Sequence, residues 1–363
     1  MRVLFVSAFS STELDAYRQR LINLKEGLKQ FNVSVGSLYL GDCFIKSPSL
    51  LKALGIPLIR KEFEQYDVIH AGASPACYVM GLAKRLGHYT LVQDVHGCIE
   101  ELSLLKGILN FRRDFSYLQE LILEEISNRN SDLFITCSKP LKDRLLQKGI
   151  DKDIVEVIHN GVDAEVFRPK DCASDGKEFV VTYAGSFQEW QGIANLLAAA
   201  KLTSDADLKF RIIGFRNEDK MLKNTIKSML RSRVELIDSL EQTELVNQLC
   251  SSDILVIPRN RSIATQMAFP TKFAEYLAVG KPVIMTNVDE TSSFVREYGC
   301  GFVCEPSAEA LAQSIMKAKR LPHEALIQMG ENGRRLAELK FDRKVIGEQY
   351  YEFLQSRLSE LAC

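Results

Sequence analysis

The chain has 363 residues, of which 46% are hydrophobic and 26% charged, as is ordinary for a soluble globular protein. Its formal net charge of −1 argues against a nucleic-acid-binding protein that relies on a strongly basic face. A chain of this length exceeds what one hydrophobic core usually covers, so we expect two domains. The nine cysteines form no CxxC pair, which favours reduced, buried thiols in a cytoplasmic protein without a metal site.

Strands and helices alternate through the first half of the chain. Residues 3–8 form a short apolar run, which we interpret as a strand rather than a signal peptide because no small-residue cleavage site follows it. Residues 13–31 place apolar side chains on one stripe, as an amphipathic helix does. Further strands are predicted at 33–40, 67–71, 90–94 and 133–137. This alternation predicts a doubly wound parallel sheet, whose ligands bind beyond the carboxyl ends of the strands.

Polar residues follow several of these predicted strand ends. Ser10 lies in a Ser/Thr-rich loop, His96 in an Asp-Val-His-Gly turn and Asn160 in an Asn-Gly turn. A lone histidine is more often a structural residue than a functional one, and we interpret His70 in that way. The position of His96 directly after a strand, before a glycine, favours a functional role for it.

The second half begins with a strand at 179–184, a loop from Gly185 to Gly192 and a helix at 193–201. A glycine-flanked loop between a strand and a helix N-terminus is a phosphate-binding geometry, because free N–H groups and the positive end of the helix dipole point at the anion. The Asp-Ala-Asp sequence at 205–207 precedes its strand, so we interpret it as a turn rather than a metal site.

Residues 252–287 are predicted as strand, loop, helix, tight turn and strand. The apolar run 254–257 is typical of a strand buried on both faces. Pro270 suits the first turn of a helix, and Gly280 suits its C-terminal cap. Glu275 lies inside this otherwise apolar helix, about one turn from its N-terminus. The remaining predicted elements are a strand at 301–304 and helices at 309–319, 324–339 and 341–358.

Two segments of the sequence resemble those of a known protein family. FPTKFAEYLAVGKPVI, at 269–284, resembles the nucleotide-sugar-binding region of retaining glycosyltransferases of family 4, the group 1 glycosyltransferases. The phrase at 158–163, with Phe167 and Pro169 after it, resembles the sequence that ends the first domain of that family. The resemblance implies an α/β fold of the GT-B type, in which two Rossmann-like doubly wound domains face each other across a cleft. It divides the chain into an acceptor-binding domain at 1–166, a nucleotide-sugar-binding domain at 178–340 and a helix at 341–363 that crosses back to the first domain.

The resemblance also implies roles for single residues. Glu275 accepts hydrogen bonds from the ribose hydroxyls, since a carboxylate offers two acceptor oxygens; the alternative is an ordinary surface glutamate. His96 faces the donor sugar and is the candidate catalytic residue, with Ser10 and Asn160 on the acceptor side. The implied donor-binding residues are Gly185, Ser186, Gln191, Gly192, Arg261, Phe269, Pro270, Thr271, Lys272 and Glu275.

The chain departs from the family pattern at three positions. Ser186 and Gln191 stand where the family carries an arginine and a lysine that bind the diphosphate, and Met267 stands where it carries a second glutamate. We expect Lys272 and Arg261 to supply the missing positive charge. Arg216 and Arg259 are further candidates.

We therefore predict transfer of a sugar from a UDP- or GDP-linked donor to a hydroxyl of a glycan or lipid-linked saccharide. The reaction proceeds with retention of configuration and needs neither metal nor cofactor. Two alternatives stay open: an inactive homologue that acts as a partner subunit in glycan assembly, and a sugar-nucleotide epimerase of the same fold. Segments 47–60 and 104–117 mix apolar with basic residues, and they are candidates for peripheral contact with the cytoplasmic membrane face. No nucleic-acid partner is expected.

Overall fold

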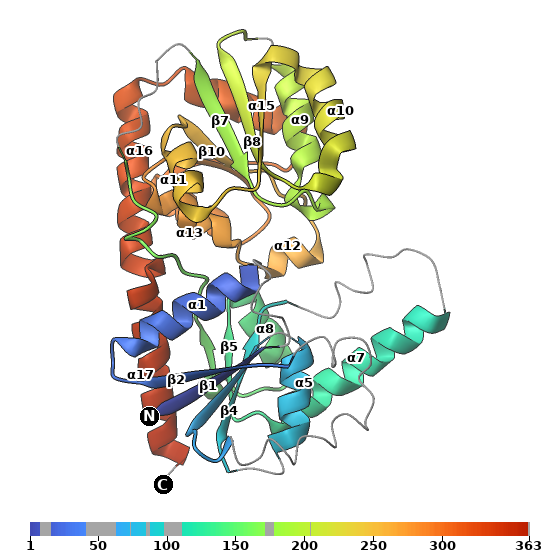
Figure 1. The fold of residues 1–363 in the computed structure, drawn as a ribbon, viewed down its shortest axis with the longest axis vertical. Helices are drawn as coiled ribbons and strands as arrows, with labels where there is room; N and C mark the ends of the chain where they lie inside the picture. The colour runs from blue at the N-terminus through green and yellow to red at the C-terminus, as the bar shows by residue number, and fades with distance from the viewer. Residues whose placement is uncertain are drawn as a thin grey trace. The chain divides into compact units, whose positions relative to one another are not determined.

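The computed structural model describes residues 1–7, 16–40, 63–72, 74–84, 88–97, 111–170, 178–203 and 205–361. The chain divides into two compact units: a first unit, Met1–Gly161 with Arg343–Cys363, and a second unit, Val162–Asp342. Each unit contains a six-stranded parallel sheet covered by helices (Figure 1). The predicted α/β class with two doubly wound domains is therefore confirmed. Ser10 and the segment 47–60 lie outside the described residues, as does 104–110.

The sheet of the first unit has the strand order β2-β1-β3-β4-β5-β6, with every pair parallel. The central strands are buried, apart from the half-buried Thr90 at the start of β4, because helices cover both faces of the sheet. This order places the ends of β3 and β4 side by side, with Gly72 opposite Asp94. The strands are β1 (Arg2–Ser7), β2 (Ser34–Tyr39), β3 (Val68–Gly72), β4 (Thr90–Val95), β5 (Leu133–Thr136) and β6 (Val155–Val157).

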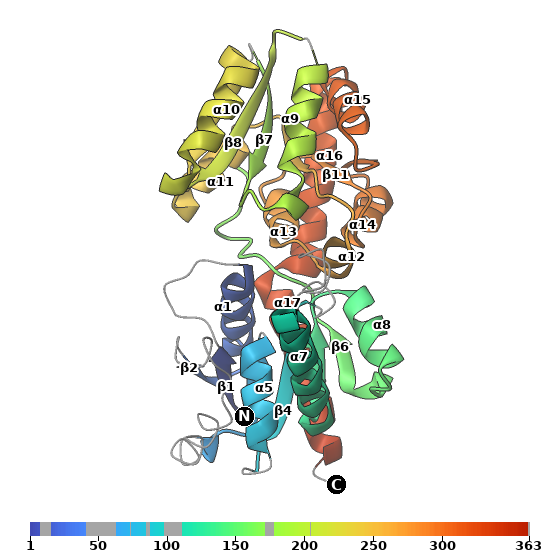
Figure 2. The ribbon, with the colours of Figure 1, turned by 90° about the vertical axis from the view of Figure 1, so that its right-hand side faces the viewer.

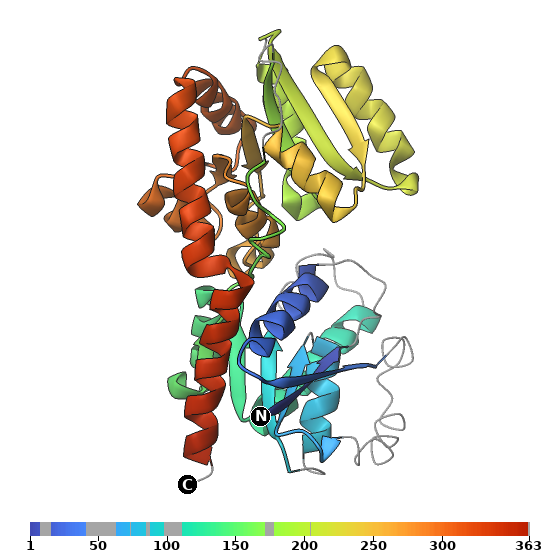
Figure 3. The same cartoon turned by 60° about the vertical axis from the view of Figure 1, so that its left-hand side comes forward.

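The helices of the first unit include one from the far end of the chain. α17 packs along α1, and in Figure 3 it is the red helix beside the dark blue one. The two backbones touch where they cross: a Cβ atom added to Gly347 would lie 2.3 Å from the Cα atom of Gly27. Only glycine at both positions permits this approach. The helices are α1 (Ala16–Lys29), α5 (Ser74–Ala83), α7 (Phe111–Asn130), α8 (Lys139–Gln147) and α17 (Arg343–Leu361).

The second unit repeats this architecture with the strand order β12-β11-β10-β7-β8-β9. Helices α9 and α15 lie side by side (Figure 2), over a core that includes Leu196, Phe210 and Ile315. The strands are β7 (Phe179–Ala184), β8 (Leu208–Phe215), β9 (Val234–Asp238), β10 (Ile254–Ile257), β11 (Val283–Thr286) and β12 (Gly301–Cys304). The helices are α9 (Ile193–Leu202), α10 (Lys220–Leu230), α11 (Gln242–Cys250), α12 (Ile263–Met267), α13 (Thr271–Ala278), α14 (Thr291–Tyr298), α15 (Ala308–Lys319) and α16 (His323–Leu336).

The boundary between the units differs from the sequence-based boundary at residue 166. The chain leaves the first unit at Gly161, because Val162 already donates its N–H to the carbonyl of Phe341, at 2.8 Å. Arg334 then holds the carbonyls of Ala164 and Phe167 at 3.0 and 2.7 Å. Residues 162–166 therefore belong to the second unit.

Candidate active site

The loop after β7 depends on two glycines with left-handed backbone conformations. Gly185 has φ +143° and Gly192 has φ +71°, values that L side chains rarely adopt. A side chain at position 192 would also clash with the backbone, because a Cβ atom there would lie 1.8 Å from the carbonyl oxygen of Pro258. The loop is fixed to the segment after β10 through Asn260, which donates its backbone N–H to Trp190 and its side-chain amide to Glu189. A rigid loop thus connects β7 to the N-terminus of α9.

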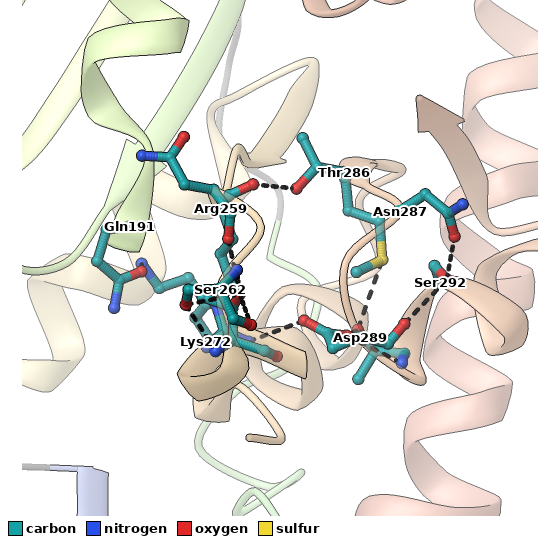
Figure 4. Close-up of polar contacts among 12 residues, drawn as sticks. Gln191, Arg259, Ser262, Lys272, Thr286, Asn287, Asp289 and Ser292 are labelled. Carbon is teal, nitrogen blue, oxygen red and sulfur yellow. Dashed lines mark hydrogen bonds and ion pairs between the residues drawn. The ribbon is translucent and has the colours of Figure 1, made fainter. Parts of the chain in front are cut away.

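Lys272 points its ammonium group at this loop. The Tyr276 hydroxyl ties α13 to the end of β7, because it accepts a hydrogen bond from the Ala184 N–H at 2.8 Å. Lys272 lies one helical turn before Tyr276, and its Nζ atom donates to Gln191 Oε1 at 3.0 Å (Figure 4). The same Nζ atom lies 4.2 Å from the centre of the Tyr183 ring, and a Cβ atom on Gly185 would approach it to 2.6 Å. The structure therefore brings together Gly185, Gln191 and Lys272, three of the predicted donor-binding residues.

Glu275 lies one turn after Lys272 on the same helix. Burial raises the pKa of the Glu275 carboxyl to about 7, against the opposing pull of Lys272. Burial likewise lowers the pKa of Lys272 to about 7, with a further contribution from the positive charge of Arg259. Among the described residues, no hydrogen bond or ion pair engages the Glu275 carboxylate. The two side chains are thus both desolvated, and both retain hydrogen-bonding capacity.

A second buried cation, Arg259, lies close enough to influence Lys272. It pairs with Asp289 at 2.8 Å, and its carbonyl accepts a hydrogen bond from Thr286 at 2.7 Å (Figure 4). Its Nε atom is buried and has no hydrogen-bond partner among the described residues. The sequence gives Arg259 only as a further candidate, whereas the structure places its charge close enough to lower the pKa of Lys272.

The first unit brings together two more of the predicted residues. His96 follows β4 directly, and its Nε2 atom lies 3.4 Å from Asn160 Nδ2. The ring of Tyr17 meets the His96 ring edge to face, with centroids 5.6 Å apart. His96 is half-buried and Asn160 is fully buried.

Comparison with protein families identifies the family of the chain. A family model described as "Glycosyl transferases group 1" matches residues 167–336, and one described as "Glycosyltransferase Family 4" matches residues 27–166. The chain belongs to the group 1 glycosyltransferases of family 4.

Individual relatives of this glycosyltransferase are distant. An Escherichia coli protein named "UDP-Gal:alpha-D-GlcNAc-diphosphoundecaprenol alpha-1,3-galactosyltransferase" is 26% identical, over 68% of this chain and 64% of its own length. Sucrose-phosphate synthase from Thermosynechococcus elongatus has a TM-score of 0.80 and 17% identity, over 99% of both chains. Anabaena HepE in complex with UDP-glucose has a TM-score of 0.74 and 20% identity, over 98% of this chain and 100% of its own. These structures have the same GT-B fold.

Among the described residues, the other predicted donor-binding residues form no hydrogen bond or ion pair with the Lys272 ammonium group. The Phe269 side chain is 2% exposed, with its ring centre 5.4 Å from that of Phe341, so it is part of the core and only its backbone can face a ligand. Arg261 donates to the carbonyl of Asn287 at 2.9 Å and pairs with Glu305 at 3.3 Å. Ser186 is exposed on the loop, Pro270 precedes α13 and Thr271 begins it.

Sequence reasoning missed a buried network behind His96. Arg20 and Asp94, both fully buried, form an ion pair at 2.9 Å, although 74 positions separate them in the chain. His70, interpreted as structural, contacts Tyr350 of α17 at 2.9 Å. Arg20 gives no signal in the sequence, because it is one of several polar residues in an amphipathic helix.

Within the described ranges, no group of three or more His, Cys, Asp or Glu side chains is placed to hold a metal ion. In the same part of the chain, no helix is both long enough and apolar enough to cross a membrane.

Proposed function

We propose that this glycosyltransferase transfers a sugar from a nucleotide diphosphate donor to a hydroxyl acceptor with retention of configuration. The observation that carries the proposal is the position of Lys272, whose ammonium group faces the Gly185 loop while Glu275 lies one turn further along α13. A cation and an acceptor carboxylate spaced by one turn fit the diphosphate and the ribose of one nucleotide.

Lys272 and Arg259 take the place of the missing loop cations. Backbone N–H groups of the Gly185–Gly192 loop supply the remaining donors for the diphosphate. The loss of a side-chain cation at Ser186 and Gln191 is offset because Gln191 accepts a hydrogen bond from Lys272 and so orients its ammonium group. Glu275 accepts hydrogen bonds from the two ribose hydroxyls, for which it retains both oxygens.

The relatives support a particular donor and acceptor. HepE is in complex with UDP-glucose, and the name of the Escherichia coli relative specifies UDP-galactose and a diphosphoundecaprenol-linked acceptor. We propose a UDP-hexose as donor and a lipid-linked saccharide as acceptor. Peripheral membrane contact and a cytoplasmic location are part of the same proposal.

The reaction needs no protein nucleophile. The bond between the anomeric carbon and the diphosphate breaks, a bond to the acceptor oxygen forms on the same face, and the acceptor proton passes to the departing phosphate oxygen. Lys272, Arg259 and the loop N–H groups stabilise the charge that develops on the leaving group. We assign His96 to a hydroxyl of the transferred sugar. No metal has a role in this scheme, so chelation should leave the rate unchanged.

The first test is a thermal-shift screen of UDP, GDP, ADP and their sugar conjugates, with and without EDTA. Glu275→Gln replaces the carboxylate by an uncharged amide of nearly the same volume. Glu297→Gln makes the same change at an exposed position of α14. We expect stabilisation by one nucleotide, unaffected by EDTA, reduced in Glu275→Gln and retained in full in Glu297→Gln. Equal responses in both variants would refute the ribose role.

Product analysis separates the proposed transferase from its alternatives. The bound sugar nucleotide is incubated with and without a lipid-linked saccharide, and the products are identified by NMR. Transfer with retention supports the proposal. A changed sugar stereocentre without acceptor would indicate the epimerase, and binding without any reaction would indicate a partner subunit.

A further inference from the structure

A continuous chain of polar contacts runs through the first unit and ends at His96. Tyr350 of α17 contacts His70 of β3, and His70 Nε2 lies 3.4 Å from Asp94 Oδ2. Asp94 accepts two hydrogen bonds from Arg20. Nε of Arg20 donates to Oδ2 at 2.9 Å, and Nη2 donates to Oδ1 at 2.9 Å. Nη1 of Arg20 donates to the Ile158 carbonyl at 2.6 Å and to Asn160 Oδ1 at 3.2 Å. Asn160 Nδ2 completes the chain at His96 Nε2, 3.4 Å away.

The chemistry of Arg20 sets the direction of every later bond. A guanidinium group has only donors, so the Asn160 atom that faces it must be the oxygen. The opposite amide orientation would place two donors against each other. The amide nitrogen of Asn160 therefore faces His96, and it donates because an amide NH2 group has no acceptor. His96 Nε2 must then accept, which leaves the ring proton of the neutral imidazole on Nδ1.

Asp94 keeps Arg20 in place for this role. The side chains of Arg20 and Asp94 are both 0% exposed, and the bidentate contact fixes the guanidinium plane. Burial raises the pKa of Asp94, but Arg20 and His70 outweigh burial and the net shift is downward. The pair therefore stays ionised, and the donor next to Asn160 is permanent.

We infer that Arg20, held by Asp94, is a positioning residue that fixes His96 as a neutral imidazole protonated on Nδ1, through the amide of Asn160. The inference rests on the proposed function for its role in catalysis, since it concerns the ring assigned to the transferred sugar. It adds that this ring is set in one orientation and one tautomer before substrate binds. Such preorganisation removes the need to reorient the ring during the reaction.

The tautomer is measured directly on the full chain labelled with ¹⁵N-histidine. Long-range ¹H–¹⁵N NMR distinguishes a protonated ring nitrogen from an unprotonated one, and His96→Gln assigns the signal among the five histidines. At about pH 8.5, where an ordinary imidazole is neutral, we expect Nδ1 of His96 to be protonated and Nε2 unprotonated. A native signal with the proton mainly on Nε2 would overturn the inference.

Asn160→Asp tests the link by an isosteric change. A carboxylate still accepts from Arg20, but it now presents an acceptor to His96, so the proton should move to Nε2. Asn23→Asp is the matched control, because Asn23 is a buried amide that donates to the Gly161 carbonyl at 2.6 Å and lies outside the chain of contacts. We expect the native tautomer in Asn23→Asp. The same tautomer in Asn160→Asp as in the native protein would contradict the proposed link.

Arg20→Lys tests the origin of the chain without changing Asn160. Lysine retains the charge that Asp94 needs, but it lacks the fork that reaches Ile158 and Asn160 together. We expect a mixture of His96 tautomers and a kcat lower by about 10²-fold, with the KM for the nucleotide donor unchanged. A single native tautomer in Arg20→Lys would overturn the positioning role. The NMR result does not depend on turnover, so a protein with the expected tautomer but no transferase activity would refute the proposed function alone.

Discussion

Two buried pairs of opposite charge, one in each unit, are built in opposite ways. Arg20 and Asp94 form a bidentate ion pair, and their environment shifts the pKa of Asp94 down and that of Arg20 up, against the desolvation of both. Lys272 and Glu275 form no ion pair within the described residues. Burial lowers the pKa of Lys272 to about 7 and raises that of Glu275 to about 7. The first pair is held charged, whereas each side chain of the second pair loses its charge close to neutral pH, Lys272 as pH rises and Glu275 as pH falls.

The difference distinguishes a scaffold from a binding site. Charges that satisfy each other add nothing for a ligand, but they can orient neighbouring groups, as Arg20 orients Asn160. Charges that are desolvated without mutual pairing destabilise the free protein and are relieved when an oppositely charged ligand arrives. Under the proposed function, a diphosphate would supply such relief for Lys272, and hydrogen bonds from the ribose hydroxyls would do so for Glu275.

The largest effect is expected from breaking the first pair. Arg20→Met leaves the Asp94 carboxylate buried and unpaired, which should lower the free energy of unfolding by about 3–5 kcal/mol. Arg129→Met removes an arginine from an exposed ion pair with Glu125 on α7, and it should cost less than about 1 kcal/mol. Denaturant unfolding of the three proteins measures both values.

The double variant Arg20→Met with Asp94→Leu sharpens this result. It removes both charges, so it should be more stable than Arg20→Met alone. If the two single losses simply add in the double variant, the pair does not act as a unit and the scaffold interpretation fails.

A smaller effect, on ligand affinity, is expected from the second pair. The ammonium form of Lys272, which binds the diphosphate under the proposed function, is lost as pH rises through about 7, while the carboxylate form of Glu275 is lost as pH falls through about 7. Affinity for a UDP-sugar should therefore be highest near pH 7 and fall on both sides. Calorimetric titrations from pH 5.5 to 9 measure the profile, since the doubly esterified diphosphate does not change charge there.

Lys272→Met and Glu275→Gln show which residue causes the fall in affinity on each side of pH 7, the alkaline limb and the acid limb of the profile. Lys272→Met should lower affinity by about 10²-fold and remove the alkaline limb, and Glu275→Gln should remove the acid limb. The free Lys272→Met protein should be at least as stable as the native one near pH 6. There the native protein carries a buried ammonium that the unfolded chain would solvate, so the lowered pKa of Lys272 costs stability. A lower melting temperature for free Lys272→Met would show that the lysine is structural.

The sequence predicts the loop and its facing helix because the signals are local. Gly185 and Gly192 mark the loop, and Lys272 and Glu275 lie one turn apart on a helix with clear start and stop residues. The burial of the Phe269 side chain could not be predicted, because neighbouring residues at a helix start can face either solvent or the core, and the aromatic cluster with Phe341 decides it. The scaffold could not be predicted, since no local signal connects Arg20 to Asp94 or either one to Tyr350.

The smallest effect is expected at Arg261, and it tests whether burial is what gives a cation its role. Arg259 and Arg261 lie two positions apart, but the side chain of Arg259 is 5% exposed and that of Arg261 is 50% exposed. The exposed charge is screened by water and already contacts Glu305, so Arg261→Gln should change donor affinity by less than about threefold and stability by less than about 1 kcal/mol. Arg259→Gln leaves the buried Asp289 without its cationic partner, so it should lower both quantities more. Titration calorimetry and denaturant unfolding of the two variants give the comparison. A tenfold loss of donor affinity in Arg261→Gln would show that an exposed arginine reaches the diphosphate, and burial would then no longer separate binding cations from the rest.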